Sequence, residues 1–169
     1  CSSDLLANLG TGTLNSDGVA TLNGDAAAET ANINTGTLNL NGELTEVSEL
    51  NISEGATLTN GSAERLNDAA VVNNAGTMTL SGDENVTTFN ADRGLLDGSG
   101  VLTAETYNLS NGAATAAGAD LGTGTVNKGP GEATLSGNTN ANTINIESGA
   151  LSTDGLVQNE RGLITVASE

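Results

Sequence analysis

The chain has 169 residues, a length that suits one domain. Its 21 acidic and four basic residues give a formal net charge of −17, which excludes nucleic acid as a partner, because affinity for phosphate backbones depends on clustered Lys and Arg. Only 36% of the residues are hydrophobic and Phe89 and Tyr107 are the only aromatic residues, so an ordinary globular core is not expected, and no transmembrane segment of about 20 apolar residues is present.

A repeat of about 19 residues runs through the sequence and outweighs the disorder that low hydrophobicity and high charge would otherwise indicate. Each copy has an Asn, a Gly four residues later and a second Gly six residues after the first. The copies are Asn8/Gly12/Gly18, Asn32/Gly36/Gly42, Asn51/Gly55/Gly61, Asn90/Gly94/Gly100, Asn108/Gly112/Gly118, Asn127/Gly131/Gly137 and Asn145/Gly149/Gly155, and an eighth, Gly76/Gly82, has Val72 in the Asn position. We therefore predict one all-β domain, residues 1–169, folded as a parallel β-helix (β-solenoid) of about eight coils of 18–21 residues.

The residues on either side of each Asn are usually apolar, as Ala31 and Ile33 are. This alternation predicts a short strand with the apolar pair pointing inward and the Asn outward. A second strand is expected after the first Gly, with Leu38 and Leu40 inward, followed by a more variable third strand such as Leu44–Val47. The glycines suit the corners because Gly adopts positive φ without strain. Stacked Asn side chains are expected to hydrogen-bond along the solenoid, which is a structural role.

Helix-friendly composition is confined to Ala26–Ala31 and Ala63–Val72, in the two longest copies, and we expect both to be bulging loops or single turns. The interior is expected to be a column of aliphatic side chains. Its predicted members are Leu38, Leu40, Ile52, Met78, Leu80, Leu109, Leu135, Ile144 and Ile146.

Several segments resemble a known group of repeats. Gly36–Gly42 (GTLNLNG), Gly76–Gly82 (GTMTLSG) and Asn145–Leu151 (NIESGAL) are similar to the β-strand repeats of bacterial filamentous-haemagglutinin-like and autotransporter adhesins. The resemblance covers nearly the whole chain. It implies a right-handed parallel β-helix, export to the cell surface or to the biofilm matrix, and a role in adhesion or scaffolding.

Catalytic chemistry has few candidates. The chain has no His, which removes Ser–His, Cys–His and most zinc arrangements. A β-helix lyase or glycosidase would need paired carboxylates in a groove with basic and aromatic residues. The candidate pairs are Asp83 with Glu84, Glu46 with Glu49, and Asp92 with Asp97. With two aromatic residues in the chain, we expect no catalytic site and interpret the acids as a solvated surface that keeps the protein soluble.

Calcium is the one cofactor that the composition leaves open, since it prefers oxygen ligands, but Asp17, Asp97 and Asp154 do not recur at one position of the repeat. Thr-x-Thr pairs are similar to those of ice-binding solenoids. They occur at Thr11/Thr13, Thr35/Thr37, Thr57/Thr59, Thr77/Thr79 and Thr123/Thr125. Because their positions shift relative to the glycines, we expect no flat Thr array and interpret these residues as β-branched strand formers.

These observations favour a non-enzymatic structural segment of a bacterial cell-surface or biofilm-matrix adhesin, located outside the cell. The alternatives are a carbohydrate-binding or carbohydrate-processing β-helix and a self-assembling, lipid-anchored fibre subunit. Cys1, with the following Ser2 and Ser3, resembles the lipidated start of a mature bacterial lipoprotein, or is an arbitrary boundary. The apolar segments Leu5–Leu9 and Gly162–Val166 suggest head-to-tail pairing of terminal coils, and a polysaccharide or a host surface is the other expected partner.

Overall fold

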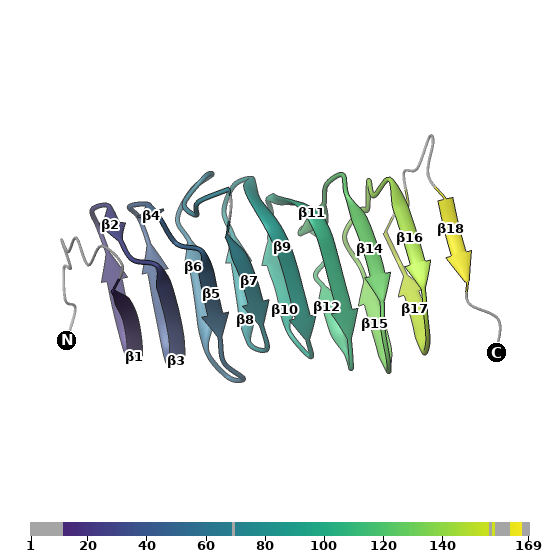
Figure 1. Cartoon of the computed structure of the whole chain (residues 1–169), viewed down its shortest axis with the longest axis horizontal. Helices are drawn as coiled ribbons and strands as arrows, with labels where there is room; N and C mark the ends of the chain where they lie inside the picture. Colours follow the sequence, from purple (N-terminus) through teal and green to yellow (C-terminus); the bar gives the residue numbers. More distant parts are fainter. Residues whose placement is uncertain (1–11, 69, 156, 158–162, 167–169) are drawn as a thin grey trace.

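The computed structural model describes residues 12–68, 70–155, 157 and 163–166, and every regular element among them is a β-strand. In chain order the strands are β1 (Thr13–Leu22), β2 (Ala26–Ala27), β3 (Thr30–Leu40), β4 (Leu44–Thr45), β5 (Glu49–Ile52), β6 (Thr57–Asn60), β7 (Val71–Asn74), β8 (Thr77–Leu80), β9 (Glu84–Asp92), β10 (Leu95–Gly98), β11 (Val101–Ser110), β12 (Ala113–Thr115), β13 (Asp120–Leu121), β14 (Thr125–Lys128), β15 (Glu132–Leu135), β16 (Thr143–Ile146), β17 (Ala150–Thr153) and β18 (Leu163–Val166). They stack side by side along one long axis, from β1 near the N-terminus to β18 near the C-terminus (Figure 1). No helix in the described part of the chain is long and apolar enough to cross a membrane.

The stack has three walls, and all of its strand pairs are parallel. The first wall, called here the Asn wall, has the order β1-β3-β5-β7-β9-β11-β14-β16-β18. The second wall has the order β1-β3-β6-β8-β10-β12-β15-β17, because the long strands β1 and β3 turn a corner and contribute to both walls. The third wall comprises β2, β4, β13, the first halves of β9 and β11, and isolated bridges. The predicted parallel β-solenoid of about eight coils is confirmed.

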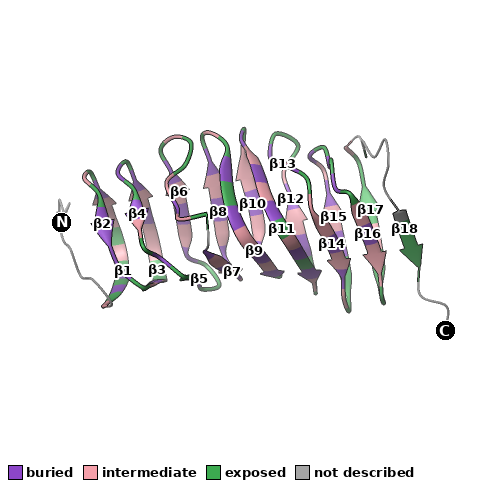
Figure 2. Cartoon of the chain, turned by 45° about the horizontal axis from the view of Figure 1, so that its top comes forward, coloured by how far each residue is buried: buried purple, intermediate pink, exposed green. Residues whose placement is uncertain are grey.

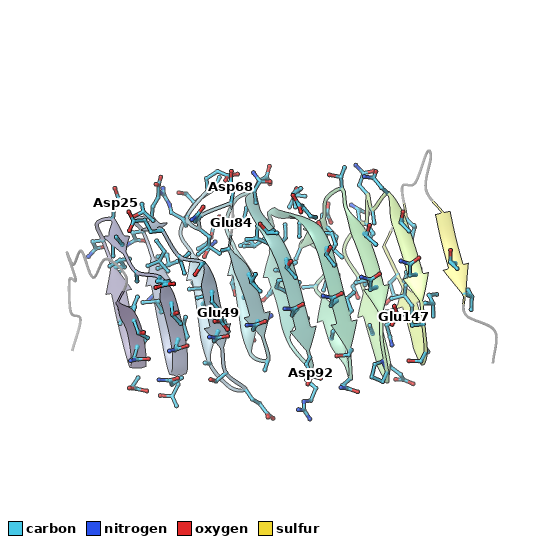
Figure 3. All side chains as sticks on the ribbon, in the orientation of Figure 1. Asp25, Glu49, Asp68, Glu84, Asp92 and Glu147 are labelled. Carbon is cyan, nitrogen blue, oxygen red and sulfur yellow. The ribbon has the colours of Figure 1, made fainter. Side chains whose placement is uncertain are left out.

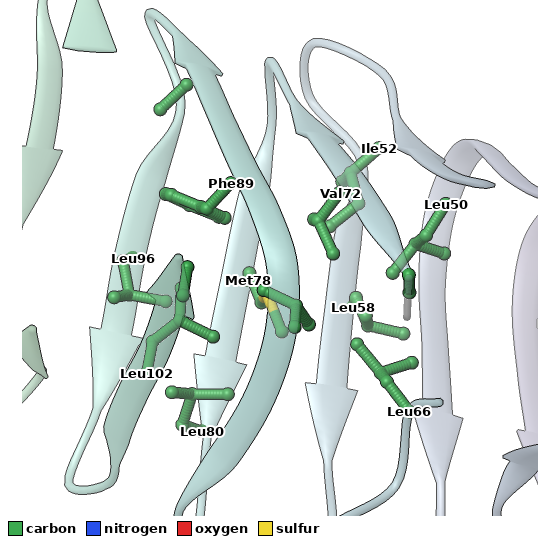
Figure 4. Packing of buried hydrophobic residues seen from close by; sticks show 14 of the residues in the cluster. Leu50, Ile52, Leu58, Leu66, Val72, Met78, Leu80, Phe89, Leu96 and Leu102 are labelled. Carbon is green, nitrogen blue, oxygen red and sulfur yellow. The ribbon is translucent and has the colours of Figure 1, made fainter. Parts of the chain in front are cut away.

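The interior is built by period-two alternation on each wall. In β6, β7 and β8 every second residue is buried (Figure 2). Register then places like residues above one another, as in the ladder Leu58–Met78–Leu96 of the second wall (Figure 4). Adjacent strands of a sheet lie about 4.8 Å apart, so eight coils form a rod roughly 38 Å long. The aliphatic residues predicted to lie inside are buried, except that Ile146 is only partly buried.

Two details of the predicted repeat frame are wrong. Gly18, not Gly12, pairs with Gly36. The first complete coil therefore has Gly18 and Gly24 at its corners, and the interval between its first glycine and that of the next coil becomes similar to the intervals in the rest of the chain. In the fourth coil Val72 points into the core, and the Asn position is occupied by its neighbour Asn73. The corner between β7 and β8 has two residues, against four between β5 and β6, so Asn73 lies three residues before Gly76 and outside the spacing of four that was used to find it.

The two helix-friendly stretches also differ from expectation in part. Ala26–Ala31, expected to be a loop or single turn, contains β2 and the start of β3, because Ala26, Ala28 and Ala31 are small enough to be buried in a narrow part of the core. In the second stretch, Leu66 forms a parallel bridge with Leu44 and the chain enters β7 at Val71, while the residues between them, as far as they are described, form a loop.

Candidate functional site

Eight Asn side chains form a continuous ladder on the outside of the Asn wall. Each Nδ2 donates a hydrogen bond to the Oδ1 of the Asn in the preceding coil, over distances from 2.7 to 3.1 Å. The members of this Asn ladder are Asn15, Asn32, Asn51, Asn73, Asn90, Asn108, Asn127 and Asn145. An amide has two N–H donors and two lone pairs, so an inner member uses half of its capacity in the ladder.

We expect Asn108→Ala to lower the free energy of unfolding by about 1 kcal/mol, because it removes two side-chain hydrogen bonds that are partly open to water. Asn108 donates to Asn90 and accepts from Asn127. Ser110→Ala, an outward change on the same strand, is the matched control. Urea unfolding followed by circular dichroism measures both, and equal midpoints for the two variants would contradict a stabilising role for the ladder.

The glycines of the predicted repeat lie where the chain turns from one wall to the next. At Gly36, φ is +72° and an added Cβ would lie 2.2 Å from the Gly18 carbonyl oxygen, so no other residue fits there. At Gly100 the same atom would lie 2.0 Å from the Gly82 oxygen. The remaining members of the predicted set are Gly42, Gly55, Gly61, Gly94, Gly112, Gly118, Gly131, Gly137, Gly149 and Gly155, and all of them follow or separate strands at these turns.

Glu84 is a fully buried carboxyl in the third wall. Its Oε2 accepts hydrogen bonds from Asn60 Nδ2 at 2.6 Å and from the Arg65 N–H at 3.0 Å, and its Oε1 accepts one from the Leu66 N–H at 2.8 Å. Burial raises the pKa of Glu84 to about 7, although the two backbone donors act in the opposite direction. The group has no exposed surface, so it cannot contact a substrate in this structure; it ties the loop before β7 to β9.

Lys128 is fully buried at the end of β14. Its Nζ donates to the carbonyl oxygens of Gly131 at 2.7 Å and Ser148 at 3.2 Å, and it also contacts those of Gly129 and Pro130. Burial lowers the pKa of this amine, and Glu132 opposes that shift. The ammonium joins two successive corners, since Gly131 and Ser148 belong to neighbouring coils.

Tyr107 places a hydroxyl in the interior at the junction of the third wall and the Asn wall. The hydroxyl accepts a hydrogen bond from the Ala104 N–H at 2.8 Å and faces the carbonyl oxygens of Leu102 at 2.8 Å and Thr123 at 3.1 Å, to which it can donate. Burial raises the pKa of Tyr107 to about 12, so the hydroxyl keeps its proton at neutral pH. Glu84, Lys128 and Tyr107 each satisfy backbone groups at corners, where the strand ladder is interrupted.

The three carboxylate pairs suggested by the sequence do not converge on a common site. Glu84 is buried, whereas its neighbour Asp83 lies outside and accepts a hydrogen bond from the Val101 N–H of the next coil at 2.9 Å. Asp92 forms an ion pair with Arg93 at the lower corner and Asp68 lies at the upper edge (Figure 3). Asp97 accepts from the N–H of Gly98 on the second wall. Glu46 and Glu49 are exposed, and Glu49 lies on the Asn wall, where it accepts from Asn73 at 3.2 Å.

Two open depressions formed by described residues lie beside the Asn wall. One, of about 330 Å³, lies beside the short corner after Asn73 and is lined by the amides of Asn51 and Asn90 and by Ser53 and Asp92. The other, of about 500 Å³, runs along the junction of the third wall and the Asn wall, and its lining includes Asp68, Asn85, Thr103, Glu105 and Asn142. Neither lining includes Lys, Arg or an aromatic residue. Both depressions are open to solvent, in contrast to the clefts that enclose most of a small molecule's surface.

The expectation that no flat Thr array forms is wrong. Thr37, Thr57 and Thr77 stand in one register column of the second wall, and Thr59 and Thr79 stand in the next. An extra residue at the Gly55 corner compensates for the shift in spacing that the sequence shows. A longer Thr column lies on the Asn wall, where its members precede the ladder Asn residues by two positions. The recurring pattern Thr-x-Asn, at Thr13, Thr30, Thr88, Thr106, Thr125 and Thr143, was the sequence signal for it.

The alternation of buried and exposed positions was also a signal for two of the buried polar groups. Glu84 lies two residues before the buried Val86, and Lys128 lies two residues after the buried Val126, so both are on the inward side of their strands.

Among the described residues there is no group of three or more His, Cys, Asp or Glu side chains placed to hold a metal ion. Asp17 accepts a hydrogen bond from Asn34 on the Asn wall, and Asp154 follows β17 on the second wall. Cys1 and Asn8, proposed from the sequence as a lipidation site and a repeat position, lie outside the described residues.

Comparisons with protein-family models, with curated proteins and with solved structures found no match for this chain.

Proposed function

We propose that this chain is a non-enzymatic structural segment of an exported bacterial adhesin, a stiff rod that holds or links other parts at the cell surface or in the biofilm matrix. The observation that carries the proposal is the unbroken hydrogen-bonded stack: parallel pairing continues from β1 to β18, and the Asn ladder reinforces it from Asn15 to Asn145. Among the described strands, neighbouring coils are hydrogen-bonded through the Asn wall and, as far as β17, through the second wall as well. Bending or stretching the rod therefore requires many hydrogen bonds to break together.

The surface chemistry supports a structural role over the carbohydrate-processing alternative. Phe89 and Tyr107 are 1% and 0% exposed, so neither ring is available to stack on a sugar. The exposed acids are spread over different edges of the rod, and Asp83 and Asp120 each bond to a backbone N–H of the following coil. Acidic side chains thus contribute both to solubility and to the joining of coils.

Head-to-tail stacking is part of the proposal. Ile164 pairs with the buried Ile144 in register, so it continues the inner column of the Asn wall, yet it is 56% exposed. Val166 is 66% exposed. An additional coil, from the same polypeptide or from another copy, would cover these side chains and pair with β18, whose one partner among the described strands is β16.

A rod made of equivalent coils should tolerate the removal of one whole coil. We expect deletion of residues 113–131 to leave a folded solenoid that is shorter by about 4.8 Å, because Gly112 then takes the place of Gly131 and β15 pairs with β10. The maximum dimension from small-angle X-ray scattering measures the change. Deletion of residues 113–121, about half a coil, is the control and should unfold the protein. Equal damage from the two deletions would contradict the modular rod.

Location decides the adhesin part of the proposal. Immunogold labelling of intact cells of the source bacterium with antibodies to the purified chain should decorate the cell surface or the surrounding matrix. Labelling confined to the cytoplasm of sectioned cells would overturn it, whatever the shape of the molecule.

A further inference from the structure

The outer surface of the Asn wall carries two parallel columns of side chains. One is the Asn ladder; the other, two residues earlier on each strand, is called here the Thr column. In register order it contains Thr13, Thr30, Glu49, Val71, Thr88, Thr106, Thr125 and Thr143. Over the four strands β9, β11, β14 and β16 the pattern is unbroken. These four coils present eight side chains of two kinds, which form a regular Thr–Asn lattice.

The lattice has fixed spacings because it is part of a β-sheet. Neighbouring coils are about 4.8 Å apart along the rod, and residues two apart on one strand are separated by about 6.7 Å. The residues between each Thr and Asn point inward and hold the sheet in place: Phe89, Tyr107, Val126 and Ile144 are all 0–1% exposed. The Asn side chains are also held by their ladder bonds, so their outward groups occupy repeated positions.

The lattice is polar but carries no charge. Each of the inner amides Asn108 and Asn127 retains one N–H and one lone pair beyond its ladder bonds, and each Thr adds a hydroxyl and a methyl group. The nearest acids lie at its margins: Asp92 and Glu147 each follow a ladder Asn by two residues, and Glu105 precedes Thr106. No aromatic ring is exposed on the lattice, which disfavours an insoluble polysaccharide. A second copy is also disfavoured, because the face of all eight coils covers roughly 400 Å², about half of what each partner in a stable dimer buries.

We propose that the Thr–Asn lattice of β9, β11, β14 and β16 binds the surface of ice. Water molecules bonded to the hydroxyls and amides take up the spacing of the coils, which is close to that of the oxygen rows in hexagonal ice. Ordering them costs little additional entropy at a growing crystal, because bridging waters are held by fixed partners on both sides. The Thr methyl groups fill the gaps between these waters. This inference is independent of the proposed adhesin role.

Partition into ice tests the proposal. The purified chain is left in solution while a polycrystalline ice hemisphere grows slowly, and protein in the melted ice is measured against that in the liquid. We expect the wild-type chain to enter the ice. Thr106→Lys and Thr125→Lys should lose most of this partition, because a long charged side chain in the centre of the lattice keeps the ice surface away.

Thr77→Lys is the matched control, since Thr77 belongs to the Thr array of the second wall. It should leave partition into ice unchanged, and circular dichroism melting of all three variants checks that they are folded. Exclusion of the wild-type chain from ice overturns the proposal, and so does equal partition of wild type and the Thr125 variant. Loss of partition in the Thr77 variant alone would place ice binding on the second wall and overturn its assignment to the Asn wall. Binding to chitin or cellulose particles without partition into ice would make the lattice a polysaccharide surface and would equally overturn it.

Discussion

Met78→Asp is expected to lower the free energy of unfolding by several kcal/mol, enough to unfold the domain, because it places an unpaired charge in an aliphatic column. Met78 has no exposed surface, and its register partners Leu58 and Leu96 have none either (Figure 4). None of the three side chains offers a hydrogen-bond donor. The carboxylate must therefore either take up a proton or draw water into the stack.

Thr77→Asp, one residue earlier on β8, is the matched control for Met78→Asp. Thr77 points outward between Thr57 and Leu95, so the same new charge stays in water and should change stability by less than about 0.5 kcal/mol. Thermal unfolding followed by circular dichroism compares the two. Similar melting temperatures would show that the inward and outward faces of the second wall have been assigned the wrong way round.

Stability should fall as the pH rises from about 4.5 to about 7, and Glu84 should account for a large part of the change. The pKa of Glu84 is about 7 in the folded chain and about 4.5 in an exposed, unfolded one. Between these values the folded state holds a proton that the unfolded state has lost, so unfolding becomes easier by about 1.4 kcal/mol per pH unit, roughly 3 kcal/mol in total. Below pH 4.5 both states are protonated and above pH 7 both are ionised, so Glu84 contributes no further slope.

Comparison with Glu84→Gln isolates this effect from the general repulsion of an acidic chain. The Gln amide oxygen can take the place of Oε1 and accept from the Leu66 N–H. Its NH2, in the place of Oε2, can donate to Asn60 Oδ1, which has no partner in the structure, if the Asn60 amide turns over, while the Arg65 N–H loses its acceptor at every pH. Urea unfolding from pH 4 to 8 should give a shallower slope for Glu84→Gln than for the wild-type chain. Parallel curves would mean that Glu84 is ionised over this whole range and that its three donors outweigh the cost of burial.

Much of the architecture could be predicted from the period of Asn and Gly alone. Gly at corners and apolar residues beside each Asn are local requirements, set by backbone φ and by the alternation of a strand. They identified a parallel solenoid and the inward positions of Leu38, Met78 and Leu135. The same reasoning failed at Val72, because Asn73 lies three residues before Gly76, and the usual spacing of four points to Val72, on the opposite face of the strand.

The sequence by itself determined the repeat, the strand faces and the absence of a His-based catalytic site. The tertiary structure decided which residues of different coils lie side by side: that Asn73 completes the ladder, that Glu84 meets Asn60, that Lys128 reaches Ser148, and that Thr88, Thr106, Thr125 and Thr143 form one column. Coil lengths vary, and the variation is absorbed at the corners. Neighbours separated by 17 to 24 residues are therefore set by the register of the backbone hydrogen bonds, which no fixed spacing in the sequence specifies.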